Sequence, residues 1–193
     1  MPYALYQQGT RIKAGERTEV LAEIIAPYFN SNSGWDGIYP HYYLPPNKAT
    51  GLPALTINGN IAHFSHPVFG IYYNSAPIYL KALLENVIGK LTLNPLLRME
   101  NFPAFARAAL TAQGGRRIVH LLSYLPEKRG KNMQVIEEPV ELHDVIVSLQ
   151  KDRSEIKKVY LAPGRKSLDY SNDGQRIAVK VPVVNGYAMV IFE

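Results

Sequence analysis

The chain has 193 residues, of which 47% are hydrophobic and 19% charged, a composition that can bury a core and that excludes an intrinsically disordered protein. Its formal net charge is +5, but the basic residues form short scattered clusters rather than the dense patch of a nucleic-acid-binding surface, so we expect no nucleic-acid partner. The absence of cysteine excludes disulfides, thiolate metal sites and a cysteine nucleophile.

Neither a targeting signal nor a membrane segment is visible in the sequence. The N-terminal residues lack the apolar centre of a signal peptide. No apolar run approaches the length of a membrane span. We therefore expect a cytoplasmic protein without membrane contacts.

The first part of the chain combines a helical pattern with a hairpin. Residues 16–26 place four aliphatic side chains on one helical face, and Pro27 is expected to end that helix. Residues 54–64 read as two short strands around Asn58-Gly59, a strong signal for a hairpin turn.

A second helix is expected to begin near Pro77, with Asn74 or Ser75 as its N-cap. Its apolar stripe has helical spacing and consists of Leu80, Leu83, Leu84, Val87, Ile88 and Leu91. Such a stripe must be buried on another layer, and this region offers little sheet to bury it. We therefore expect an incomplete α/β part, whose cover comes from residues upstream of Met1 or from a partner chain.

Strand patterns dominate from about residue 99 onward, organised around the apolar run 113–125. Turn signals at Pro163-Gly164 and Asn185-Gly186 separate several of these segments. The expected strands cover 104–112, 117–125, 140–149, 158–161, 176–181 and 187–192. Short strands at this spacing predict a β-sandwich of about seven or eight strands.

Histidines and carboxylates offer no convincing catalytic or metal site. His63 and His66 have HxxH spacing, but in a strand that ends at Pro67 they would point to opposite faces, so structural roles are favoured over metal ligation. A local polar pair is expected between His143 and Asp144. Glu137 and Glu138 are adjacent on extended chain and would face apart, which does not suit glycoside hydrolysis. We expect no metal, no cofactor and no catalytic residue in this chain.

The loop 28–47 is the one sharp candidate for a binding site. Aromatic faces combined with amide and carboxylate groups suit carbohydrate recognition, and they suit a subunit interface equally well. An interface or packing within the loop is favoured over sugar binding. The candidate residues are Trp35, Asp36, Tyr39, His41, Tyr42 and Tyr43.

Three long stretches together resemble one protein family. They are PYFNSNSGWDGIYPHYYLPP, LTINGNIAHFSHPVFGIYYNSAPIYLKALLENVIGKLTLNPLL and GRRIVHLLSYLPEKRGKNMQVIEEPVELHDVIVSL. The match consists of an x-G-N hairpin, a P-x-F-x-x-Y step, a helix, R-x-V-H-L-L-x-Y and V-I-E-E, and it covers most of the chain in order. The sequence is similar to the C-terminal region of bacterial glycoside-hydrolase-like proteins of the β-galactosidase type.

In that family a (β/α)8 catalytic barrel precedes an amidotransferase-like trimerisation domain and a small β-sandwich. The resemblance implies that residues 1–98 are part of the amidotransferase-like α/β domain and that residues 99–193 are the C-terminal β-sandwich. The implied fold class is α/β plus all-β, an incomplete flavodoxin/amidotransferase-like part followed by an antiparallel sandwich. The catalytic carboxylates would lie upstream, so no catalytic residue is carried over. Residues 30–44 depart from the family, which has a Ser-His-Gln-His-like run in place of YPHYYLP.

The sequence therefore favours a non-catalytic C-terminal module of a carbohydrate-active enzyme, which serves assembly and support of an upstream catalytic barrel. The alternative from a different class is a carbohydrate-binding module that uses the aromatic loop 28–47. An independent enzyme with His41 or His63 as its base is a weaker third hypothesis.

Self-association is also expected. If the helix stripe from Leu80 to Leu91 lacks its cover, it leaves an apolar patch that soluble monomers rarely expose. The simplest product is a two-fold dimer, and the trimer of the family requires an interface that lies wholly within these residues.

Overall fold

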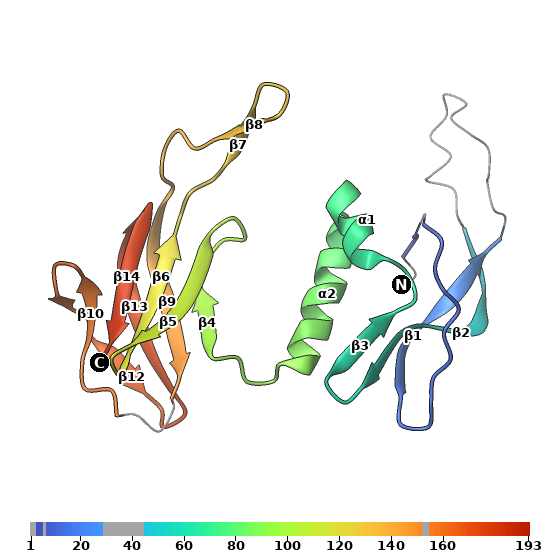
Figure 1. Ribbon diagram of the computed structural model, residues 1–193, viewed down its shortest axis with the longest axis horizontal. Coiled ribbons are helices and arrows are strands. Elements are labelled where there is room, and N and C mark those ends of the chain that lie inside the picture. Colours follow the sequence, from blue (N-terminus) through green and yellow to red (C-terminus); the bar gives the residue numbers. More distant parts are fainter. Residues whose placement is uncertain (1–2, 6, 29–44, 152–154) are drawn as a thin grey trace. The chain divides into compact units, whose positions relative to one another are not determined.

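The computed structural model describes residues 3–5, 7–28, 45–151 and 155–193, and it divides the chain into two compact units, Met1–Leu93 and Asn94–Glu193 (Figure 1). We call them unit 1 and unit 2. The sequence resemblance assigns residues 1–98 to an amidotransferase-like domain and residues 99–193 to a C-terminal β-sandwich, and these two assignments stay predictions.

Unit 1 contains a three-stranded antiparallel sheet in the order β1-β2-β3 (Figure 1). Its strands are β1 (Glu19–Pro27), β2 (Pro46–Asn58) and β3 (Ile61–Phe64). The predicted hairpin is confirmed, because Asn58 pairs with Ile61 and Gly59 takes the left-handed backbone, with φ +56°, that the tight turn needs.

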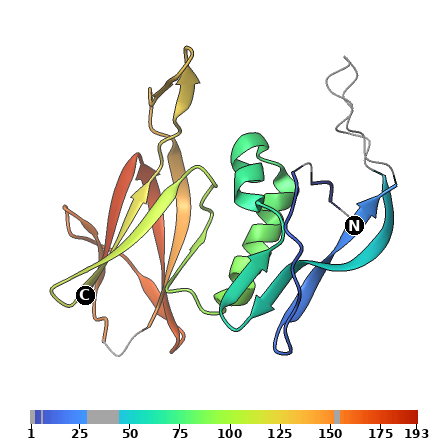
Figure 2. The same ribbon diagram turned by 45° about the vertical axis from the view of Figure 1, so that its right-hand side comes forward.

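Two helices follow the sheet and lie beside β3 in both views (Figures 1 and 2). They are α1 (Val68–Ser75) and α2 (Ile78–Leu91). The second helix was predicted, but its N-cap is Pro77 and no side chain caps it, so the predicted Asn74 or Ser75 cap is wrong. Four buried residues from the two helices form a small core, namely Val68, Ile71, Leu80 and Leu84.

The helix predicted at 16–26 is wrong, because this segment is the edge strand β1. Over so short a run, the spacing of its aliphatic residues fits the period of a helix and that of a strand. Val20, Ile24 and Ile25 are β-branched residues, which favour strands. Pairing with β2 decides the outcome, although four register shifts interrupt the ladder. The described strands of unit 1 pair antiparallel, whereas a flavodoxin-like sheet is mostly parallel. A flavodoxin-like part is therefore not confirmed.

Unit 2 consists of antiparallel sheets that face one another as a sandwich (Figure 2). One sheet has five strands in the order β11-β10-β14-β6-β5, and the other has four in the order β12-β13-β9-β4. The strands are β4 (Leu97–Glu100), β5 (Arg107–Gln113), β6 (Arg116–Leu122), β9 (Glu141–Gln150), β10 (Val159–Ala162), β11 (Lys166–Ser167), β12 (Tyr170–Asn172), β13 (Arg176–Asn185) and β14 (Tyr187–Phe192).

The core of unit 2 lies between these two sheets. Val119, Leu121 and Phe192 from the five-stranded sheet are fully buried against Val145 and Val181 of the four-stranded sheet, all with 0% exposure. Alternate residues along each strand supply this core, as expected for a two-layered antiparallel fold. The prediction of a β-rich, sandwich-like second part is confirmed at this level.

Glycines with left-handed backbone connect several of these strands, and the turn predicted at Asn185-Gly186 is one of them. Gly114 and Gly115 form a two-residue turn between β5 and β6, and both have positive φ values, +55° and +79°. Gly186, with φ +77°, carries the chain from β13 in one sheet to β14 in the other. A separate hairpin, β7 (Glu127–Arg129) and β8 (Met133–Val135), extends from unit 2 (Figure 1).

None of the helices in the described part of the chain combines the length and apolar character needed to cross a membrane.

Candidate functional site

The six residues predicted to bind carbohydrate or a subunit lie outside the described part of the chain. They are Trp35, Asp36, Tyr39, His41, Tyr42 and Tyr43. Their role, carbohydrate binding or an interface, stays a prediction.

The two histidines of the HxxH pair occupy different environments. His63 lies on β3, opposite Thr56, and is exposed. His66 follows the strand, and its Nδ1 lies 2.8 Å from the Ser65 hydroxyl oxygen. Gly9 packs on the His66 ring so closely that an added Cβ would lie 2.7 Å from Cε1. Burial lowers the pKa of His66, which favours its neutral form.

No group of three potential metal-ligating side chains occurs among the residues that the structure describes. The predicted His143–Asp144 pair is wrong. His143 Nε2 instead lies 2.9 Å from Oε1 of Glu141, two residues away on the same face of β9. Asp144 has a left-handed backbone, with φ +52°, and pairs with Lys180 on β13 at 3.3 Å. These exposed contacts are structural, and surface ion pairs of this kind contribute little to stability.

The Glu137 carboxylate is used locally, in a cluster with Arg129. Glu137 accepts two hydrogen bonds from the Arg129 guanidinium, at 3.3 and 2.8 Å. Glu127 also pairs with Arg129, at 2.8 Å, and both carboxylates raise the pKa of that guanidinium, Glu137 most. This arrangement holds the β7–β8 hairpin and places no acid opposite a base.

The outward face of the five-stranded sheet carries a polar network that sequence analysis missed. His120 Nδ1 lies 2.7 Å from the Tyr187 hydroxyl oxygen, and His120 Nε2 lies 3.1 Å from the hydroxyl oxygen of Thr111. The rings of His120 and Tyr187 stack with their centroids 6.1 Å apart. Both imidazole nitrogens thus have a hydroxyl partner, and the three residues lie on the neighbouring strands β14, β6 and β5. This network contains no carboxylate that could act as a second catalytic group.

Unit 1 exposes apolar side chains on its helices. Phe69 and Tyr73 are 68% and 89% exposed, and their spacing of four residues places them on the same face of α1. Ile78, at the start of α2, is 80% exposed. We call these three residues the helical patch. Adjacent exposed aromatic side chains of this kind are typical of interaction surfaces rather than of solvated helices.

The helical patch differs from the stripe that the sequence predicts. Leu80, Leu84 and Val87 of that stripe are already buried, with 1%, 9% and 6% exposure. The N-terminal segment contributes to this cover, since Leu5 packs on the helical core and the Tyr79 hydroxyl donates to the Ala4 carbonyl at 2.8 Å. The premise that this stripe lacks cover is therefore wrong for these three residues.

No protein-family model and no curated protein matches the chain. Among solved structures, α-L-fucosidase isoenzyme 2 from Paenibacillus thiaminolyticus matches with a TM-score of 0.85 and 27% sequence identity, over 99% of this chain and 29% of that chain. A cycloisomaltooligosaccharide glucanotransferase from Paenibacillus sp. matches with a TM-score of 0.40 and 17% identity over 50% of this chain and 16% of that chain, a likeness too weak to use. The chain therefore resembles, over nearly its whole length, less than a third of a bacterial glycoside hydrolase.

Proposed function

We propose that this chain is a non-catalytic C-terminal module of a glycoside hydrolase and that it serves assembly and support of a catalytic barrel that precedes it. The observation that carries the proposal is the likeness to the Paenibacillus fucosidase, which covers nearly all of this chain and only 29% of the enzyme. The described residues support it from another direction, because His66, His120 and Glu137 are engaged in structural contacts.

The activity of the parent enzyme is a further proposal, and it has two sources. We propose release of a terminal sugar, with an α-L-fucoside as the first substrate class to examine and a β-galactoside as the second. The first choice follows the name of the similar structure, and the second follows the resemblance of the sequence to β-galactosidase-type proteins. The finer assignment of unit 1 to an amidotransferase-like trimerisation domain rests on that sequence resemblance alone, because the described strands pair antiparallel.

The purified chain should not hydrolyse 4-nitrophenyl α-L-fucoside or β-D-galactoside. The parent enzyme, with the barrel attached, serves as the positive control in the same assay. Turnover by the isolated chain that disappears in a Glu137→Gln or Glu138→Gln variant would contradict a non-catalytic role.

Assembly is proposed to use the helical patch. The Phe69→Ser, Tyr73→Ser double variant should shift the mass measured by light scattering toward the 21.6 kDa monomer at concentrations where the wild-type chain is a dimer or trimer. Met133→Ser is the matched control, because Met133 is 65% exposed on the β7–β8 hairpin and lies outside the patch. A wild-type chain that stays monomeric at high micromolar concentration would remove this part of the proposal.

A further inference from the structure

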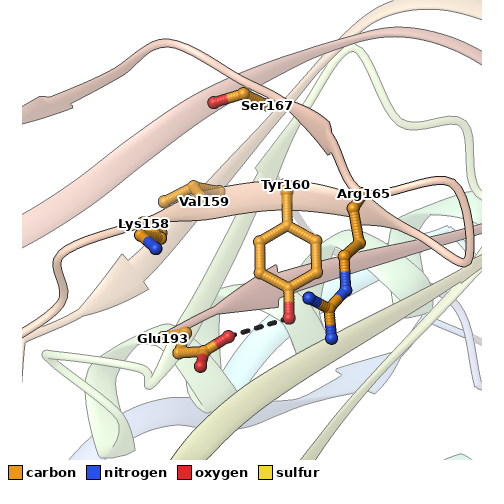
Figure 3. A pocket seen from close by; sticks show the side chains of 6 residues that line it. All are labelled: Lys158, Val159, Tyr160, Arg165, Ser167 and Glu193. Carbon is orange, nitrogen blue, oxygen red and sulfur yellow. Dashed lines mark hydrogen bonds between the residues drawn. The ribbon is translucent and has the colours of Figure 1, made fainter.

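A pocket of about 250 Å³ lies at one edge of the five-stranded sheet of unit 2, where β10, β11 and the end of β14 meet (Figure 3). Five of its six lining residues have polar or charged side chains. The lining residues are Lys158, Val159, Tyr160, Arg165, Ser167 and Glu193.

Strand register explains why these residues meet. Lys158 and Glu193 form a backbone-paired couple, with N–H···O distances of 2.8 and 2.9 Å, so their side chains project from the same face of the sheet. Tyr160 lies two residues beyond Lys158 and therefore on that face as well. Ser167 is the partner of Tyr160 on β11.

Buried apolar residues hold Tyr160 in place beneath the pocket. Its ring packs with Ile118 and Ile191, and the residue is only 9% exposed. Its hydroxyl donates a hydrogen bond to Oε2 of Glu193 at 2.9 Å (Figure 3). The bond to Oε2 orients the Glu193 carboxylate. Its other oxygen, Oε1, has no hydrogen-bond partner among the described residues and can accept a hydrogen bond from a ligand.

The two cations of the pocket have no such internal partner. Within the described chain, neither the Lys158 ammonium nor the Arg165 guanidinium forms an ion pair or a side-chain hydrogen bond, although both line the same small pocket as a carboxylate. Arginine presents a planar array of donors that matches a carboxylate, and lysine presents a compact charge.

The backbone at Arg165 adds an independent observation. Arg165 has φ +51°, a left-handed conformation that glycine adopts without cost and arginine does not. Gly164, directly before it, has no close neighbours and no positive φ. The glycine of this turn therefore does not occupy the left-handed position, and an arginine does. The turn thus keeps an arginine side chain at the mouth of the pocket at the expense of backbone strain.

We propose that this pocket binds a sugar residue that carries a carboxylate, a uronic acid. The ligand carboxylate would lie between Arg165 and Lys158, and its ring hydroxyl groups would donate to Glu193 Oε1 and bond with the Ser167 hydroxyl. A pocket of about 250 Å³ has room for one such ring. The two cations attract the ligand carboxylate, and the fixed acceptor favours a ligand that also donates hydrogen bonds.

The sugar part of this proposal rests on the proposed function, whereas the anion part rests on the pocket alone. The test is a ¹⁵N chemical-shift titration of the full chain at fixed ionic strength with D-galacturonate, D-glucuronate, D-galactose and acetate. The uronates should shift the amides of residues 158–162, 164–167 and 193, and galactose and acetate should bind at least about tenfold more weakly. Arg165→Gly and Lys158→Gln should each weaken uronate binding by about tenfold or more, the loss expected for one charge-assisted bond.

Lys128→Gln is the matched control, because it removes a lysine charge from the β7–β8 hairpin of the same unit and outside the pocket. Arg165→Gly should also retain or raise the unfolding temperature, which separates lost binding from lost folding. The proposal is overturned if no uronate shifts these amides in folded wild-type chain, if acetate binds as tightly as the uronates, or if Lys128→Gln weakens binding as much as Lys158→Gln. None of these outcomes depends on whether the parent enzyme hydrolyses a glycoside.

Discussion

Ser123 offers the clearest test of what holds unit 2 together. The residue is fully buried, with 0% exposure, where the chain leaves β6. Its hydroxyl oxygen accepts a hydrogen bond from the Gly186 amide at 2.9 Å, and the hydroxyl donates to the Val184 carbonyl at 3.3 Å. One side chain therefore connects β6 to the turn that leads from β13 in the other sheet into β14.

Ser123→Ala removes both hydrogen bonds without changing the backbone. The Gly186 amide is left buried and unpaired, which costs about 1–3 kcal/mol. The longer bond to Val184 adds less. A loss of about 2 kcal/mol is large against the roughly 5–15 kcal/mol that stabilises a typical domain. With a urea m-value of about 2 kcal/mol/M, the unfolding midpoint of unit 2 should fall by about 1 M.

Urea unfolding followed by the NMR methyl signals of Val181 and Val190 is the suitable assay, because both valines lie in the core of unit 2 and report on that unit alone. Ser171→Ala is the matched control. Its exposed hydroxyl makes one long hydrogen bond, 3.5 Å to the Ala178 carbonyl, and its loss should change stability by less than about 0.5 kcal/mol. Equal midpoints for the Ser123 and Ser171 variants would refute the reasoning.

Two further substitutions test other parts of the chain. Gly9→Ala should destabilise unit 1 by about 1 kcal/mol, the low end of an overpacking cost, because the new Cβ would meet the His66 ring at 2.7 Å and displace it. Gly89→Ala in α2, where nothing lies within 4 Å, should instead stabilise unit 1 by about 0.5–1 kcal/mol, and thermal unfolding of the two variants measures both effects. Asp173 accepts hydrogen bonds from the amides of Arg176 and Gln175, which lower its pKa in the folded state, so its stabilising contribution is complete above its unfolded pKa of about 4 and is lost as the pH falls through the lower folded value. Asp173→Asn should therefore flatten the rise of unfolding temperature with pH in this acid range, and an unchanged slope would contradict the assignment.

The strands of unit 2 could be predicted because their signals are local. Residues 176–181 alternate apolar and polar side chains, and in β13 Ile177, Val179 and Val181 are buried as that pattern predicts. Turn residues at Asn185-Gly186 end the strand where expected. The helix from Pro77 was equally visible, since its apolar spacing continues over three turns.

The missed elements depend on contacts that are distant in the sequence. β1 is a strand only because it pairs with β2, and Glu19 meets Ile57 across 38 positions. The first eight residues of β2 include Pro46, Gly51 and Pro53, which weaken a strand signal and are tolerated here because the pairing with the edge strand β1 is irregular. The short helix α1 lacks a side-chain cap and was not predicted.

The pocket could not be predicted for a related reason. Lys158 and Tyr160 share a face by simple alternation, but Glu193 joins them only through the antiparallel register of β10 with β14. Arg165 enters through a turn whose backbone conformation the sequence does not reveal, because arginine rarely adopts positive φ.

The two units differ in how completely each one buries its own sheet, and this difference bears on the proposed function. Both sheets of unit 2 contribute to a continuous core within the chain, as a self-sufficient sandwich requires. In unit 1 Leu55 and Ile57 are buried on one face of the sheet, whereas on the opposite face Thr56 is buried but Ile61 and Val20 are 71% and 46% exposed. These two exposed aliphatic side chains and the exposed aromatic pair on α1 leave unit 1 with more apolar surface for a further contact. If the proposed function holds, contact with the rest of the parent enzyme should stabilise unit 1, whereas unit 2 should unfold at the same urea concentration with or without that contact.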